Sequence, residues 1–78
     1  MVGILIKRYM QERGIELNLI AKESNIDIAE FSLMLDNKAK INTNQYYKIC
    51  CALKVNVNYF YFQYLGIEYH KPFSRENL

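Results

Sequence analysis

The chain has 78 residues and a mass of 9.3 kDa, a size at which a single hydrophobic core forms. Hydrophobic residues make up 51% of it and charged residues 23%, which is typical of a globular protein rather than a disordered one. The net charge of +2 is too small to indicate a nucleic-acid partner by itself. This size excludes a large enzyme with a roomy pocket. The longest apolar runs, such as residues 59–62, predict no transmembrane span, because a bilayer needs ~20 residues.

The N-terminal residues and the cysteines favour the cytoplasm. Lys7 and Arg8 come before any long apolar stretch, so we expect no signal peptide. Cys50 and Cys51 are neighbours in a predicted helix, where side chains point about 100° apart and a mutual disulfide has poor geometry. The abundance of Ile, Asn, Lys and Tyr indicates AT-rich coding DNA, as in a low-GC bacterium, its phage or a plasmid.

The first two predicted helices are each followed by a residue that can adopt a positive φ. Residues 2–13 have apolar side chains at helical spacing, and Gly14 stands where a left-handed residue ends such a helix. Residues 17–24 form a shorter helix, and Asn25 follows it, one of the few residues besides Gly that tolerates φ > 0. Both helices therefore have a predicted end as well as a predicted inner face.

The third helix is predicted from a capping box. Asp27 and Glu30 have the spacing in which a side chain at the helix start accepts a backbone hydrogen bond. The helix is expected to end near Asp36, with Asn37 in the left-handed conformation. A polar stretch over residues 37–42 then leads to the next helix.

Two more helices complete an all-α prediction. The fourth begins at the capping box Asn42-x-x-Gln45 and continues with an apolar stripe. Asn56 is expected to cap a fifth helix over residues 57–65, which Gly66 closes.

The spacing between the second and third helices is the most specific feature of the chain. An alanine allows two helices to approach closely, the turn needs a residue with φ > 0, and the hydrophobic residue after it fills the corner. The positions that carry this pattern are Ile20-Ala21, Asn25-Ile26-Asp27, Phe31-Ser32, Asn37-Lys38 and residues 48–58. Together they resemble the Cro/CI-type (XRE-type) helix-turn-helix family, over roughly residues 4–61.

The resemblance implies a compact five-helix, repressor-like helix-turn-helix domain over residues 1–66, with the helix-turn-helix at about 17–36 and a short C-terminal tail at 67–78. It also implies a DNA-binding transcriptional regulator that acts as a homodimer and represses by occupying its operator, with the third helix in the major groove. The base-facing positions would be Ile28, Ala29, Glu30, Ser32 and Leu33. The phosphate-facing positions would be Asn37, Lys38, Lys40, Asn42, Thr43 and Asn44.

The charge distribution departs from a typical DNA reader. Residues 27–36 hold three acids and no base, although Arg, Lys, Asn and Gln read most base edges. Residues 37–67 hold four lysines and no acid. The alternative function is therefore a helix-turn-helix scaffold that binds a protein, such as another regulator, with weak or no DNA binding. Its apolar patch would consist of Leu17, which stands where the family usually has Gln, together with Ile28 and Leu33.

A second departure concerns the core. The family often pairs an Arg in the first helix with a Glu late in the third, and these places hold Met10 and Leu35 here. Replacing both charges together by apolar groups avoids the desolvation cost of a buried ion pair. We expect Met10 to contact Leu35.

The C-terminal part of the chain is rich in aromatic residues, since residues 59–73 hold seven of the eleven. Val57 and Phe60 belong to a stripe that should dock on the core. The residues that we expect at a dimer interface are Tyr59, Phe62, Ile67, Tyr69 and Phe73. The alternative is a tail that folds back over its own domain.

No pattern indicates an enzyme, a cofactor or a metal site. Cys50 is expected in the core and Cys51 partly exposed, without Cys-x-x-Cys spacing. The single histidine, His70, is expected in solvent, and Ser32 has no histidine partner that would make it a nucleophile.

Overall fold

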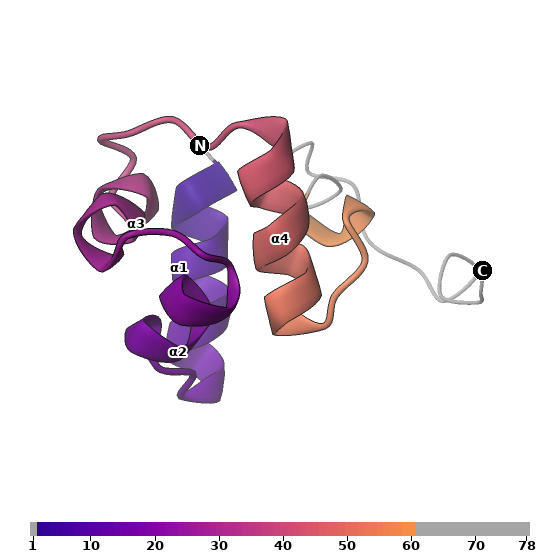
Figure 1. Cartoon of the computed structure of the whole chain (residues 1–78). Coiled ribbons are helices and arrows are strands. Elements are labelled where there is room, and N and C mark those ends of the chain that lie inside the picture. The colour runs from indigo at the N-terminus through magenta and orange to yellow at the C-terminus, as the bar shows by residue number, and fades with distance from the viewer. Residues whose placement is uncertain (1, 61–78) are drawn as a thin grey trace.

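The computed structural model describes residues 2–60, and this part of the chain is all-α without strands. It contains α1 (Val2–Arg13), α2 (Leu17–Glu23), α3 (Ile28–Leu35) and α4 (Thr43–Leu53), and residues 58–60 begin a further helical stretch. In Figure 1, α1 stands between α3 and α4, and α2 crosses its lower half. Helix α2 packs against α3 and α4, and α1 packs against α3. The all-α prediction is confirmed. The rest of the predicted fifth helix and the tail lie outside the described residues.

All four helices end with the same C-terminal capping motif. A residue with positive φ follows each helix: Gly14 (65°), Asn25 (58°), Asn37 (65°) and Lys54 (61°). The N–H group of the residue after it donates a hydrogen bond to the carbonyl five residues earlier, which is a Schellman motif. These bonds join Ile15 to Met10 (2.9 Å), Ile26 to Ala21 (2.9 Å), Lys38 to Leu33 (2.8 Å) and Val55 to Cys50 (3.0 Å). The first three left-handed residues were predicted from sequence, whereas Lys54 was not, because lysine has no preference for this conformation.

All three side chains predicted as caps accept the expected backbone hydrogen bonds, but the predicted capping box at Asp27 and Glu30 forms only on the Asp27 side. The Asp27 carboxylate accepts hydrogen bonds from the N–H groups of Ala29 (3.1 Å) and Glu30 (3.2 Å). Asn42 and Gln45 form a complete capping box, with bonds of 2.7 and 3.0 Å. The side chain of Asn56 accepts a bond of 2.8 Å from the N–H of residue 58. Caps of this kind satisfy N–H groups that a helix leaves without partners and fix where each helix begins.

The core is formed by the inner faces of the helices. Its fully or nearly buried side chains are Ile6, Met10, Ile20, Ala21, Ile26, Phe31, Met34, Leu35, Ile49, Cys50, Leu53 and Phe60. Met10 and Leu35 are both members, as expected of an apolar pair, and their direct contact stays a prediction. Burial raises the pKa of the Cys50 thiol, whereas Cys51 is exposed, so both cysteines have the predicted placement.

One prediction about the end of the described chain is wrong. Val57 was expected to dock on the core in the first turn of the fifth helix, but its side chain is 40% exposed. The helical stretch begins one residue later, so Val57 lies in the preceding turn and faces outward. Phe60 is fully buried, as expected, and its ring packs edge-on against those of Tyr9 and Tyr59, with centroids 5.6 and 5.0 Å apart.

Gly3 permits the close approach of α1 to α3. A Cβ atom added to it would lie 2.0 Å from the carbonyl oxygen of Met34, which belongs to the backbone and cannot move aside cheaply. Gly3→Ala is therefore expected to lower the free energy of unfolding by about 1–3 kcal/mol, although alanine has the better helix propensity. Urea denaturation checks this, with Ile4→Ala, a change at an exposed neighbour, as the control. An unchanged midpoint for Gly3→Ala would contradict the close approach.

Ser24 is a buried polar residue at the end of α2. Its side chain is 1% exposed, and its hydroxyl oxygen has no hydrogen-bond partner among residues 2–60. Since burying an unpaired hydroxyl is unfavourable, Ser24→Ala is expected to raise the free energy of unfolding by about 1 kcal/mol. Thermal denaturation would show this as a higher Tm, and a lower Tm would indicate that the hydroxyl has a stabilising partner.

Candidate nucleic-acid interface

Helix α3 has one buried face and one face open to solvent. Phe31, Met34 and Leu35 point into the core. Of the predicted base-facing residues, Ile28 is 43% and Leu33 46% exposed, Ala29 and Glu30 are exposed, and Ser32 is half-buried. The structure therefore leaves the predicted base-facing set on the outer side of α3, with Ser32 at its margin.

The predicted phosphate-facing residues all lie in the loop between α3 and α4 or in the first turn of α4. Every one of them is exposed: Asn37, Lys38, Lys40, Asn42, Thr43 and Asn44. The capping box holds the start of α4 in place, and the side-chain oxygen of Asn42 is used in that cap. The loop leads directly from the end of α3 to the start of α4, so the second predicted set follows the base-facing set along the chain (Figure 1).

Lys38 differs from the residues at the same place in the other three helix ends. Ile15, Ile26 and Val55 occupy that place after α1, α2 and α4, and each packs against the core. A hydrophobic residue there is the usual accompaniment of a Schellman motif. After α3 the residue is a lysine, and it is exposed. Its backbone is nevertheless fixed by the bond to the Leu33 carbonyl, so the lysine side chain starts from a defined point beside the end of α3.

The three acids of residues 27–36 do not all present a free negative charge. Asp27 caps α3, where the helix dipole also favours a carboxylate. Asp36 accepts a hydrogen bond of 2.8 Å from the ammonium group of Lys7 on α1. Glu30 remains on the exposed outer face. The tertiary structure therefore weakens the acidic character of this helix. The sequence pattern did not reveal that Lys7 pairs with Asp36, because the two residues are 29 positions apart in the chain.

The contact with Lys7 lowers the pKa of the Asp36 carboxyl from its ordinary 3.8, and Lys38 adds a weaker effect in the same direction. Asp36 therefore stabilises the fold above that ordinary value, and this contribution is lost as the pH falls through the lowered pKa. Lys7→Gln is expected to bring the pKa of Asp36 back up toward 3.8, measured by NMR titration of its carboxyl carbon. Arg8→Gln removes the same charge from the exposed neighbour and should have a much smaller effect. Equal shifts in the two variants would contradict the ion pair.

The predicted apolar patch is only partly present. Leu17 is half-buried against the core, because it lies one turn before Ile20 and Ala21 on the inner face of α2. Leu19, which the sequence analysis did not single out, is 48% exposed on the outer side of the same helix. Helical periodicity alone separates these two leucines and could have found the second. The exposed leucine of α2 is therefore Leu19.

The described part of the chain contains neither a cluster of metal-binding side chains nor a membrane-spanning helix. Among residues 2–60, no group of three or more His, Cys, Asp and Glu side chains could hold a metal ion. None of the helices in the described structure is long and apolar enough to cross a membrane.

Comparisons with protein-family models, with curated proteins and with solved structures find no match to the chain.

Proposed function

We propose that this protein is a sequence-specific DNA-binding transcriptional regulator that acts as a homodimer and represses by occupying its site. In this proposal α3 enters the major groove with its outer face toward the base edges. The loop after α3 and the first turn of α4 contact the phosphates on one side. Two copies read half-sites about one helical turn apart.

The observation that carries the proposal is the exposed lysine at the end of α3. Three helix ends place an apolar side chain on the core at this position, and the fourth places Lys38 in solvent with its backbone held by Leu33. At the margin of the face that would meet DNA, a positively charged residue therefore stands where the other three helix ends have an apolar residue on the core. Lys40 lies two residues further along the same loop and is also exposed. Phosphate contacts of this kind set the register of a protein on the duplex.

The chemistry of the α3 face favours particular bases. Ile28 and Leu33 can pack against the methyl groups of thymine, and the Glu30 carboxylate can accept a hydrogen bond from the N4 amino group of cytosine. None of these contacts is a hydrogen bond from an arginine to guanine or from an Asn or Gln amide to adenine, which are the usual ways in which proteins recognise those two bases. We therefore expect sequence preference to come from thymine and cytosine positions.

The test is selection of bound sequences from random double-stranded DNA, followed by anisotropy titrations of the selected duplex. We expect the selected duplex to bind more tightly than an unselected one, and the affinity to fall steeply between two salt concentrations, because displaced counterions accompany phosphate contacts. Failure to enrich any sequence, together with no binding at low salt, would contradict DNA recognition. Sedimentation of the protein with its duplex gives the number of copies bound, and one copy per duplex would contradict the homodimer.

One observation favours a second candidate function. Leu19, Ile28 and Leu33 are large aliphatic side chains left 43–48% exposed on α2 and α3, which suits an interface with another protein. In that case a Leu33→Asp variant would lose its protein partner, while Lys38→Glu would keep it. Under the DNA-binding proposal the larger effect comes from Lys38→Glu, because removing a phosphate contact weakens binding to every sequence.

A further inference from the structure

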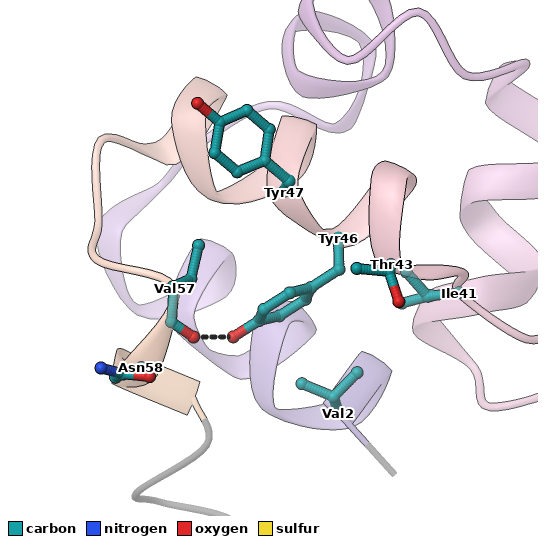
Figure 2. A pocket seen from close by; sticks show the side chains of 7 residues that line it. All are labelled: Val2, Ile41, Thr43, Tyr46, Tyr47, Val57 and Asn58. Carbon is teal, nitrogen blue, oxygen red and sulfur yellow. Dashed lines mark hydrogen bonds between the residues drawn. The ribbon is translucent and has the colours of Figure 1, made fainter.

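An apolar groove lies away from the outer face of α3, beside the last described residues. It has a volume of about 620 Å³ and is lined by Val2, Ile41, Thr43, Tyr46, Tyr47, Val57 and Asn58. Figure 2 shows the ring of Tyr46 reaching from α4 toward Val57, with Val2 beside it and Ile41 and Thr43 at its other end. Among the residues that the structure describes, no charged side chain lines this groove, and its volume is in the range of sites that hold a small ligand.

The Tyr46 hydroxyl, a polar group in the lining of the groove, is already satisfied. The Tyr46 hydroxyl donates a hydrogen bond to the backbone carbonyl of Val57. Burial also raises the pKa of this hydroxyl well above its ordinary value, so it keeps its proton at neutral pH. An occupant would therefore meet mainly the aromatic ring of Tyr46 and the side chains of Val2, Ile41 and Val57. Tyr47 is 58% and Val57 40% exposed, so both still have apolar surface to bury.

We propose that this groove holds the chain's own C-terminal segment, in particular residues 67–73. The segment continues from Phe60, two residues after the groove residue Asn58. Its sequence, Ile-Glu-Tyr-His-Lys-Pro-Phe, carries the apolar side chains Ile67, Tyr69 and Phe73. Of the two expectations for the aromatic C-terminal part of the chain, a dimer interface and a tail that covers its own domain, this proposal follows the second. It does not depend on DNA binding.

The length of the chain is sufficient for this placement. If the fifth helix extends to residue 65, as the sequence predicts, it carries the chain about 10 Å from residue 58. Gly66 is suited to a reversal there, and seven extended residues after it span about 23 Å, which is enough to return across the groove. A segment attached this closely is present at an effective concentration near the millimolar range, so it competes well against a second copy of the chain.

The test is amide hydrogen exchange by NMR on the full chain. We expect the amides of residues 67–73 to exchange more than about tenfold slower than unstructured amides, at a rate that does not change with protein concentration. Val57→Asp should remove most of this protection, because an aspartate at the groove cannot be buried without cost. Leu19→Asp introduces the same charge at a similarly exposed residue outside the groove and should leave the protection unchanged. Tyr47→Asp is a second groove variant, and the core amides report whether each variant is folded.

Three outcomes would overturn the proposal. Unprotected amides over residues 67–73 in the unmodified chain would show that the segment does not dock. Protection that appears only as the concentration rises, together with dimers in sedimentation, would identify a second copy as the occupant. Protection that persists in both folded groove variants would place the segment elsewhere on the domain.

Discussion

Phe31→Ala is expected to lower the free energy of unfolding by about 3–5 kcal/mol, the range for removing a large buried aromatic side chain. Phe31 is completely buried in the core on the inner face of α3. A domain of this length has a total stability of about 4–12 kcal/mol, so the variant should be partly unfolded at physiological temperature. Urea denaturation followed by circular dichroism measures the change, and under the proposed function the variant should also lose DNA binding in proportion to its unfolded fraction.

Leu33→Ala is the matched control for this prediction, because it truncates a large side chain two residues along the same helix on the exposed face. Its side chain is 46% exposed, and the backbone bond from Lys38 to its carbonyl does not depend on the side chain. We expect the stability to change by less than about 1 kcal/mol. If Leu33→Ala cost as much as Phe31→Ala, the assignment of inner and outer faces of α3 would be wrong.

Under the proposed function, the double variant Lys38→Glu/Lys40→Glu is expected to lower DNA affinity by about 10- to 100-fold at low salt, on specific and non-specific duplexes alike. Each lost phosphate contact should also reduce the slope of log affinity against log salt by about 0.9. Both lysines are exposed in the loop between α3 and α4, so the stability of the fold should change little. Anisotropy titrations at several salt concentrations give the affinity and the slope together.

The control for this variant is Arg8→Glu/Lys22→Glu, which makes the same change in net charge on α1 and α2. Both residues are exposed and lie outside the predicted phosphate-facing set. We expect a smaller loss of affinity and a nearly unchanged salt slope, because only long-range attraction is lost. Equal effects in the two double variants would mean that net charge acts alone and that the loop after α3 makes no phosphate contacts.

The ends of the helices show how far local sequence determines this fold. Asp27, Asn42 and Asn56 were predicted as caps, and Gly14, Asn25 and Asn37 as left-handed residues, because each of these residue types satisfies or permits the backbone locally. Lys54 adopts the same left-handed conformation without a residue type that favours it. There the packing of Val55 and Leu53 against the core outweighs the local preference.

The candidate site was less predictable than the helices. Periodicity places Ile28 and Leu33 outside and Phe31 inside, and the structure agrees. It does not reveal that Lys7 pairs with Asp36, because an ion pair between residues 29 apart depends on how α1 and α3 cross. That crossing depends in turn on Gly3, which meets the backbone of Met34.

By itself, the sequence determined the number, order and approximate limits of the helices in the described part of the chain, along with most of their inner faces. These follow from hydrogen bonds and spacings within a few residues. Tertiary structure alone decided the effective charge of α3 and the apolar groove beside Val57. Both depend on contacts between segments that are distant in the sequence, and the packing of side chains between helices determines those contacts.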